Sequence, residues 1–469
     1  MGAGGAGGDL PPDRTAAAEV DRDAAAGRRA RGAGAKPLRR AAVGGTDSHG
    51  AGDARANLVD RRAEYRFIVT LLEGLALLPL AFWVLLMLDR SRRWPWECYL
   101  PPEVAAPPSA AGNIVAVIPA RDEAALLPAT LPSLLQQEID SLRVILVDDG
   151  STDGTAEVAR TVARECNAAA RLEVIATPPT PPGWSGKVWA LVQGVTEATS
   201  GATAEAEPEW FLFSDADIEH RPGSVVALLE TAGGGAEGSR FDLVSVMARL
   251  RADTFWERLL IPPFVFFFQL LYPFRRVQDP DSEVAAAAGG CVLIRRRLLE
   301  ESGGLEEIAA ALIDDVALAK QIKRAGGRLW LGFDPGIRSL RPYDRLGQIW
   351  RMVARSAFDQ LHYRYDLLLL VLLGLLLLVA APPVLALAGA LETIGGTASA
   401  SVGRALVWAL LAWGLEALAL LPSVRHHRVP AVFAQGLPLA AVFYGLMTAG
   451  SAWSHLTGRG TRWKGRPTS

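Results

Sequence analysis

The chain has 469 residues, of which 50% are hydrophobic, and its 48 Lys and Arg nearly balance 50 Asp and Glu for a formal net charge of −2. This balance excludes a generally basic nucleic-acid binder and a generally acidic disordered chain. The three cysteines, Cys98, Cys166 and Cys291, are widely spaced and provide neither a disulfide framework nor a CxxC metal pair. A mean hydropathy of +0.20 indicates a very apolar soluble protein or a soluble domain combined with membrane spans.

The N-terminal part divides into a polar leader and an apolar segment. Residues 1–66 are a mixture of Ala, Gly, Arg and Asp, which cannot bury enough apolar surface to fold, and we predict a disordered, low-complexity leader. Residues 67–88 are apolar except for Thr70 and Glu73. This length is sufficient for a transmembrane helix.

Further apolar segments lie near the C-terminus, within residues 367–456. They are Leu367–Leu391, Ala405–Leu421 and about Pro430–Trp453, and a basic tail, 457–469, follows them. We predict about three C-terminal membrane segments; the alternative is buried helices of a soluble protein. The charges of the loops favour a cytoplasmic position for residues 94–365, which lie between the N-terminal span and the C-terminal spans. A re-entrant third C-terminal segment would keep the basic tail on the cytoplasmic side.

Residues 94–365 have the composition of a globular domain. Within them, residues 259–274 are intensely apolar but short, and Pro262-Pro263 interrupts them. We expect an interfacial helix at the membrane surface here, with a buried core helix as the alternative.

Strand-like and helix-like segments alternate in this domain from Asn113 onward. Short apolar runs predict strands at Ile114–Ile118, Val144–Val147, Leu172–Ala176 and Trp210–Phe213, and helix-like segments include Ala124–Gln137 and Thr152–Ala169. Ser151 or Thr152 is the expected N-cap of the second helix. Repeated βα units predict an α/β fold whose mostly parallel sheet carries helices on both faces and binds ligands at the carboxyl ends of its strands.

Carboxylates directly follow two of these strands. Asp148 and Asp149 follow one strand, and Asp215 and Asp217 follow another. Two carboxylates one residue apart offer hard oxygen ligands to a divalent cation that also binds a diphosphate. Each motif alone would be read as a solvated turn, but two such motifs after buried strands favour a ligand site.

Several motifs carry a resemblance to a known family. They are Ile118-Pro119-Ala120-Arg121-Asp122-Glu123, Val147-Asp148-Asp149-Gly150-Ser151-Thr152-Asp153, Ser214-Asp215-Ala216-Asp217, the Lys187 loop Gly183–Ala190, Gly289-Gly290-Cys291, Asp314-Asp315, Gln348-Ile349-Trp350-Arg351-Met352 and Trp463-Lys464-Gly465-Arg466. Over about residues 113–360 the chain resembles the family 2 glycosyltransferases with the GT-A fold. With its apolar segments it is similar to the hopene-associated membrane glycosyltransferases of bacteria. Asp314 stands where the family usually has Glu, and Met352 stands where it has Trp. The absence of the Trp ring at position 352 disfavours processive polymer synthesis.

The resemblance implies an inverting, metal-dependent transfer of a single sugar from a nucleotide-diphosphate sugar to a membrane lipid hydroxyl, with a hopanoid as one such acceptor. The implied nucleotide-sugar-binding residues are Pro119, Ala120, Arg121, Glu123, Asp148, Asp149, Lys187, Asp215 and Arg351. Asp217 and Asp215 would hold Mg²⁺ or Mn²⁺. Asp315 is the candidate general base and Asp314 its neighbour, and Gly289, Gly290, Gln348 and Trp350 lie on the acceptor side.

Other interpretations of these residues remain open. Asp314-Asp315 would also suit the N-terminus of a helix over Val316–Arg324, and Lys187 would also suit a solvated loop. A polyprenyl-phosphate acceptor would need no general base, and a non-catalytic membrane scaffold would need no intact site. The expected location is the bacterial cytoplasmic membrane, with the catalytic domain facing the cytoplasm and no nucleic-acid partner.

Overall fold

The computed structural model describes residues 70–71, 73–89, 91–92, 94, 97–102, 112–200, 207–233, 240–457, 461–463 and 466–468. The predicted leader, residues 1–66, lies outside this set, as do Lys464 and Gly465 of the tail motif.

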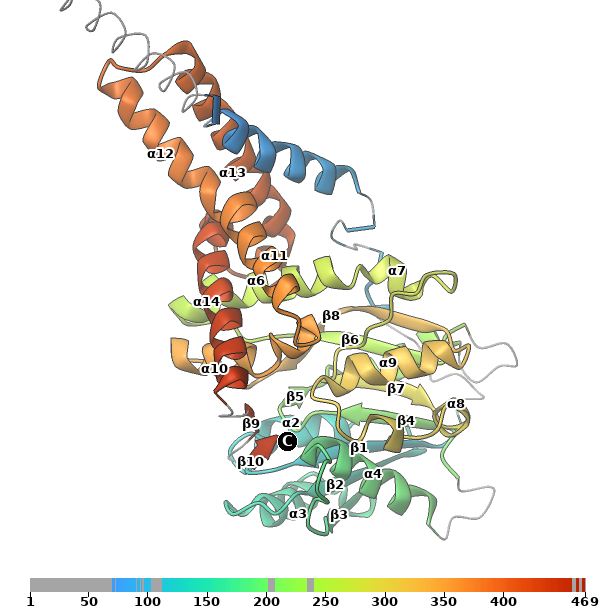
Figure 1. Cartoon of the computed structure of the whole chain (residues 1–469). Helices are drawn as coiled ribbons and strands as arrows, with labels where there is room; N and C mark the ends of the chain where they lie inside the picture. Colours follow the sequence, from blue (N-terminus) through green and yellow to red (C-terminus); the bar gives the residue numbers. More distant parts are fainter. Residues whose placement is uncertain are drawn as a thin grey trace, which may run out of the picture. The chain divides into compact units, whose positions relative to one another are not determined.

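A mixed sheet forms the centre of the globular domain (Figure 1). Its strands are β1 (Ile114–Ala120), β2 (Leu142–Asp148), β3 (Leu172–Ala176), β4 (Trp210–Ser214), β5 (Ile218–Glu219), β6 (Leu243–Arg249), β7 (Cys291–Arg295) and β8 (Leu329–Ser339), in the order β3-β2-β1-β4-β7-β6-β8-β5. Strands β1 to β4 pair in parallel with one another, and β6 pairs in parallel with β8. Strand β7 runs antiparallel to both β4 and β6.

Helices cover both faces of this sheet, and the strand residues alternate between two apolar cores. One face carries α2 (Leu127–Leu135), α3 (Thr155–Glu165) and α5 (Ser224–Ala232); the other carries α4 (Gly186–Thr199), α6 (Phe255–Leu271), α7 (Phe274–Gln278), α8 (Arg296–Glu301) and α9 (Asp314–Arg324). Along β1, Ile114, Ala116 and Ile118 pack on the first face, and Val115 and Val117 on the second. The predicted α/β fold is therefore confirmed.

The first turn of α3 differs from the sequence prediction. Its N-cap is Gly154, with φ of 84°, rather than Ser151 or Thr152. Ser151 Oγ instead accepts a hydrogen bond from the Asp122 amide, and the Thr152 amide donates to Asp122 Oδ1 at 2.8 Å. Because these residues bind the turn after β1, they are not available to cap the helix.

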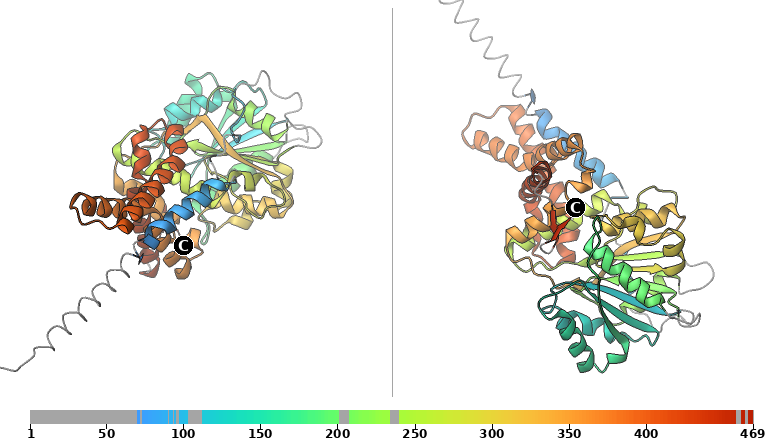
Figure 2. Two further views of the ribbon diagram at one scale, coloured as in Figure 1. Left: turned by 90° about the horizontal axis from the view of Figure 1, so that it is seen from above. Right: turned by 60° about the horizontal axis from the view of Figure 1, so that its bottom comes forward.

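Three helical segments near the C-terminus are long and apolar enough to cross a membrane (Figure 2). The first, Tyr365–Ile394, comprises α11 (Tyr365–Gly374), a π-helical turn (Leu375–Ala380) and α12 (Ala381–Ile394); the second is α13 (Ala400–His426); the third, Ala431–Leu456, comprises a 3₁₀ segment (Ala431–Gly436) and α14 (Leu437–Leu456). The third segment contains no chain reversal between 437 and 456, which differs from the re-entrant form favoured by the loop charges. The apolar helix Glu73–Leu88 is shorter than these three.

The apolar stretch 259–274 falls mostly within α6, which lies between the sheet and helices α13 and α14 (Figure 1). Pro262 and Pro263 are buried inside this helix. Helix α10 (Leu346–Ser356) packs beside α6 and α14. The remaining elements are the short 3₁₀ segments Ala169–Arg171, Glu306–Ile308 and Asp359–Leu361 and the two-stranded pair β9 (Thr461–Trp463) and β10 (Arg466–Thr468).

Candidate active site

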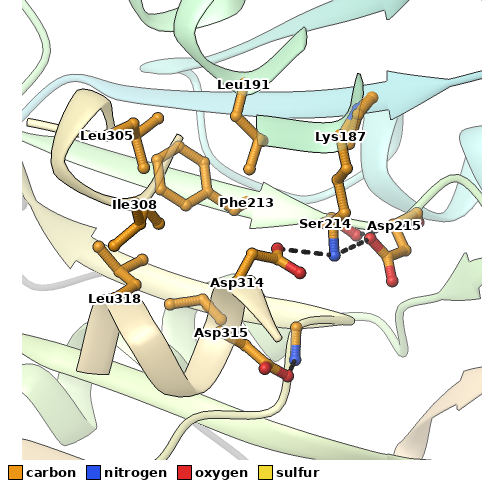
Figure 3. A pocket seen from close by; sticks show the side chains of 13 residues that line it. Lys187, Leu191, Phe213, Ser214, Asp215, Leu305, Ile308, Asp314, Asp315 and Leu318 are labelled. Atoms are coloured by element: carbon orange, nitrogen blue, oxygen red, sulfur yellow. Dashed lines mark hydrogen bonds and ion pairs between the residues drawn. The ribbon is translucent and has the colours of Figure 1, made fainter. Parts of the chain in front are cut away.

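The charged residues predicted from sequence gather where β1, β2 and β4 end. Parallel pairing brings Ala120 beside Asp148, and antiparallel pairing places Cys291, the first residue of β7, beside Ser214. The glycines before β7 therefore reach the edge at which Asp215 follows β4. The N-terminus of α9 contributes the acid pair to the same cavity (Figure 3).

Lys187 connects two groups of carboxylates at this edge. Its Nζ lies 2.9 Å from Asp215 Oδ1 and 3.3 Å from Asp314 Oδ2, and Figure 3 shows it between the two side chains. Burial opposes its charge, but Asp215, Asp314 and Asp315 together raise the pKa of the Lys187 ammonium. Lys187 is therefore a charged bridge between β4 and α9, and not a solvated loop lysine.

Asp315 is held by backbone amides on both of its oxygens. Oδ2 accepts a hydrogen bond from the Gly289 amide at 2.7 Å, and Oδ1 accepts one from its neighbour Val316 at 2.8 Å. Burial, and then the negative charge of Asp314, raise the pKa of Asp315 to about 6, although Lys187 and the two amides oppose the rise. Asp315 is thus a fixed carboxylate that titrates near neutral pH, which suits a general base. The pair also forms the first turn of α9, so the helix-terminus interpretation and the base interpretation are compatible.

Gly289 lies in close contact with this arrangement. A Cβ at this position would lie 3.0 Å from Lys187 Nζ and 3.2 Å from Asp315 Oδ2. At Gly290, a Cβ would lie 3.0 Å from Ile218 Cδ1. The glycines therefore allow the chain before β7 to approach the charged cluster closely.

Asp217 has a different set of partners, which includes a residue that the sequence analysis missed. Ser339 Oγ donates to Asp217 Oδ2 at 2.6 Å, and Arg341 Nε lies 3.3 Å from the same oxygen. Arg341 Nη2 also contacts Glu123 Oε1 at 2.5 Å. Burial opposes the charge on Arg341, but Asp217 and Glu123 raise its pKa. Arg341 follows β8, a strand that the apolar pattern did not predict, so its position beside Asp217 could not be inferred from the motifs.

The residues after β1 and β2 form a neighbouring group. Arg121 Nη1 donates to the Asp149 carbonyl at 2.8 Å and lies 3.4 Å from Asp149 Oδ2. Thr177 Oγ1 donates to Asp149 Oδ1 at 3.3 Å, and the Ser151 amide donates to Asp148 Oδ1 at 3.0 Å. Ala120 is buried and accepts the Asp149 amide through its carbonyl, and Pro119 lines the cavity. All six predicted positions on these two loops, from Pro119 to Glu123 and at Asp148-Asp149, therefore lie at one edge of the sheet.

The residues predicted on α10 lie elsewhere. Gln348 Oε1 accepts the Arg345 amide at 2.9 Å and caps this helix. A Cβ at Gly450 of α14 would lie 3.3 Å from the Trp350 ring, so Trp350 packs against the third apolar helix. Arg351 is exposed. None of these three lines the cavity around Asp315 within the described part of the chain.

The cavity itself is small and its walls combine charge with apolar side chains. Its volume is about 20 Å³, which is room for a single water molecule. Leu191, Phe213, Leu305, Ile308 and Leu318 form the apolar side of the wall (Figure 3).

The carboxylate oxygens of Asp215 and Asp217 suit a divalent cation that also binds a substrate. Across the described ranges, no three His, Cys, Asp or Glu side chains come close enough to hold a metal ion by themselves. Mg²⁺ is commonly bound by one or two carboxylates together with water and substrate phosphates. Asp215 and Asp217 provide two such carboxylates on one turn, and burial and the charge of Asp217 raise the pKa of Asp215 against the effect of Lys187. A metal ion, as a cation in addition to Lys187, would relieve the repulsion between Asp215 and Asp217, so these two residues fit a metal.

Comparisons with known proteins found a matching family model and several similar proteins. Residues 115–303 match the model of the family described as Glycosyl transferase family 2. A 4,4'-diaponeurosporenoate glycosyltransferase of Staphylococcus aureus is 37% identical over 102 residues, which is 22% of this chain and 23% of that protein. The chain thus matches less than a quarter of the length of such curated relatives.

Two solved structures are similar in part. A mannosyltransferase from Pyrobaculum calidifontis, in complex with GDP-Man and Mn²⁺, has a TM-score of 0.47 and 20% identity, covering 81% of this chain and 99% of that one. Glucosyl-3-phosphoglycerate synthase from Mycobacterium tuberculosis has a TM-score of 0.34 and 20% identity, covering 56% of this chain and 86% of that one. The residues that match the family model include Lys187, Asp215, Asp217 and Gly289.

Proposed function

We propose that the protein is a metal-dependent, inverting glycosyltransferase that moves a single sugar from a nucleotide-diphosphate sugar to a hydroxyl group of a membrane lipid. The observation that carries this proposal is the position of Asp315, a carboxylate with a pKa of about 6, in the same cavity as Asp215 and Lys187. A base, a phosphate-binding cation and a candidate metal ligand are thereby brought together. The match to the glycosyltransferase family gives independent support.

On the donor side, Asp215 and Asp217 would hold Mg²⁺ or Mn²⁺, which supplies positive charge to the leaving diphosphate. Arg121, Glu123 and Asp149 would contact the nucleoside beside them. Arg341 holds Asp217 and Glu123 in fixed positions through its two contacts. Preorganised charges of this kind stabilise a leaving group without further rearrangement.

Lys187 would change partners when the donor binds. In the closed arrangement its ammonium bridges Asp215 and Asp314 and restricts the cavity to about 20 Å³. The loop before it contains Gly183, with φ of 83°, and Gly186 begins α4. Movement of this loop would transfer the ammonium from the carboxylates to the diphosphate and make room for the sugar.

On the acceptor side, Asp315 would remove the proton of the attacking hydroxyl. The hydroxyl oxygen forms a bond to the anomeric carbon, the bond from that carbon to the diphosphate oxygen breaks, and its electron pair leaves with the nucleoside diphosphate. The proton stays on Asp315. Attack from the side opposite the leaving group inverts the configuration.

A membrane lipid is the proposed acceptor because three apolar helices of sufficient length to cross a bilayer adjoin the domain. The similar S. aureus protein is named for 4,4'-diaponeurosporenoate. We propose that the chain lies in the bacterial cytoplasmic membrane with its catalytic domain facing the cytoplasm. The resemblance to the hopene-associated glycosyltransferases suggests a hopanoid as the acceptor. The segment 67–88 would be a further span.

The test is a transfer assay on membranes that contain the full chain. A panel of radiolabelled nucleotide-sugars is supplied with Mn²⁺, the lipids are extracted, and labelled products are identified by mass spectrometry. We expect one donor to label a lipid through a glycosidic bond, and EDTA to prevent labelling. A sugar attached through a phosphate would indicate a polyprenyl-phosphate acceptor instead, and no labelling with any donor would contradict the proposed activity.

A further inference from the structure

A buried glutamate joins helix α6 to the chain segment that holds Asp217. Glu257 lies in the first turn of α6 and is fully buried. Its Oε2 accepts the amides of Asp253 and Thr254 at 3.0 and 2.9 Å, and Thr254 Oγ1 accepts the Glu257 amide, which together form a capping box. Its other oxygen, Oε1, crosses to a distant part of the chain and accepts the Tyr343 amide at 2.7 Å. A helix cap alone does not need this second contact.

The segment reached by Glu257 is the one that organises the donor side of the site. Ser339 Oγ and the Leu340 amide both donate to Asp217, to its carboxylate at 2.6 Å and its carbonyl at 2.9 Å. Arg341 then contacts Asp217 and Glu123. Tyr343 is two residues beyond Arg341, so the segment is fixed by Asp217 at one end and by Glu257 at the other.

Helix α6 is in turn hydrogen-bonded to the apolar helices. Ser423 Oγ of α13 donates to the Pro262 carbonyl at 2.8 Å, and Tyr444 Oη of α14 donates to the Leu260 carbonyl at 2.8 Å. These contacts lie within two turns of Glu257 on the same helix. Helix α6 is therefore hydrogen-bonded to α13 and α14 through its backbone and to Tyr343 through the Glu257 side chain.

We infer that Glu257 is a positioning residue: it fixes segment 339–343 against α6, so that Arg341 holds Asp217 in place for donor binding. This inference rests on the proposed function and extends it, because it adds a buried residue of α6 to those that support donor binding. Loss of the Glu257 contact would release Arg341 and Tyr343 while leaving Asp315, on a different helix, undisturbed. The effect should therefore fall on KM for the donor and not on kcat.

The test compares Glu257→Gln with Ser423→Ala in the full chain reconstituted into lipid nanodiscs. Glutamine presents one oxygen and one donor group to three amides, so it cannot keep both contacts. We expect Glu257→Gln to raise the donor KM about tenfold, as loss of a supporting hydrogen bond does, with kcat changed less than about threefold. Ser423→Ala removes a hydrogen bond from the same helix without touching Tyr343, and we expect it to leave the donor KM unchanged. An unchanged KM in Glu257→Gln, or an equal rise in both variants, would overturn the inference.

Amide hydrogen exchange provides a second measurement that needs no sugar. The Leu340 and Tyr343 amides should exchange about tenfold faster in Glu257→Gln than in the wild type or in Ser423→Ala, because opening of this segment becomes easier. Unaltered exchange would reject the role of Glu257 even if the wild-type chain transfers no sugar, so this result and failure of the proposed function are distinguishable. Should Glu257→Gln not fold, Glu257→Asp keeps the charge, withdraws the oxygen from Tyr343 and predicts the same changes.

Discussion

Two carboxylates of the site, Asp217 and Asp315, have the same chemistry but opposite surroundings. Asp217 is bound by a hydroxyl group and the Arg341 guanidinium. Asp315 is bound by two neutral amides, lies beside the negative charge of Asp314, and has a pKa raised to about 6. Carboxylate oxygens held in this way suit a divalent metal ion, whereas a buried carboxylate next to an anion readily accepts a proton. The proposed donor role of Asp217 and base role of Asp315 therefore differ through their partners and not through residue type.

The largest effect is expected at Asp217. Asp217→Asn removes the negative charge that faces Arg341 and one of the two proposed metal ligands. Transfer should fall about 10³-fold, the rate equivalent of roughly 4 kcal/mol, through loss of metal-dependent donor binding. Mn²⁺ titration of the reconstituted chain measures this loss, with Asp281→Asn, an exposed carboxylate, as the control. Wild-type Mn²⁺ dependence in Asp217→Asn would remove Asp217 from the donor role.

Lys187 tests the bridge between the two carboxylate groups. Lys187→Met keeps much of the side-chain length but removes the ammonium, and transfer should fall about 10²-fold because one charge on the leaving diphosphate is lost. Kinetics at saturating donor should show the loss in kcat. Arg324→Met, at an exposed position on α9, provides a control for altered surface charge. A kcat equal to that of the wild type would show that Lys187 serves only to hold the closed form.

Gly289 tests how closely the chain before β7 approaches Lys187 and Asp315. In Gly289→Ala the added methyl group would lie 3.0 Å from Lys187 Nζ and 3.2 Å from Asp315 Oδ2. We expect transfer to fall about tenfold through displacement of the base. Gly183→Ala in the preceding loop meets no atom within 4 Å but has φ of 83°, so it separates backbone strain from crowding of the base. Full activity of Gly289→Ala would contradict the close packing described for this site.

The smallest effect concerns pH. Since Asp315 must be deprotonated to accept a proton, and its pKa is raised to about 6, kcat/KM should fall as the pH drops through 6 and level off above it. Asp314→Asn removes the neighbouring charge that raises this pKa, so the acidic limb should move to lower pH. A pH–rate profile of both proteins measures the shift. An acidic limb at the same pH in Asp314→Asn would show that Asp314 does not influence the base.

The first half of the sheet could be predicted from sequence and the second half could not. Strands β1 to β4 are apolar runs, and carboxylates stand at the ends of β2 and β4. Both the parallel pairing and the edge that carries Asp148 and Asp215 follow from this pattern. Strand β8 contains Gly332, Pro335 and Gly336, which do not resemble a strand, and its pairing with β6 depends on contacts distant in sequence. Arg341, which follows β8, was missed for this reason.

The acceptor-side role of Gln348 and Trp350 on α10 stays a prediction. Gln348 caps the helix, Trp350 packs against α14, and neither lines the cavity around Asp315 in the described part of the chain. A helix presents only some of its residues to any one neighbour, and the spacing of a motif does not determine which face meets the site. Lys187 and Asp315, by contrast, lie at helix termini at the edge of the sheet, where few other orientations are open to their side chains.

The central claim is that Asp315 is the base for transfer to a hydroxyl group, and one paired measurement on Asp315→Asn tests it most directly. Transfer to lipid and binding of the labelled donor are measured on the same reconstituted protein. We predict a loss of transfer of at least about 10²-fold, which is typical for removal of a general base, with donor binding close to that of the wild type. Retained transfer with normal binding would contradict the account and would favour a phosphate acceptor, which needs no base.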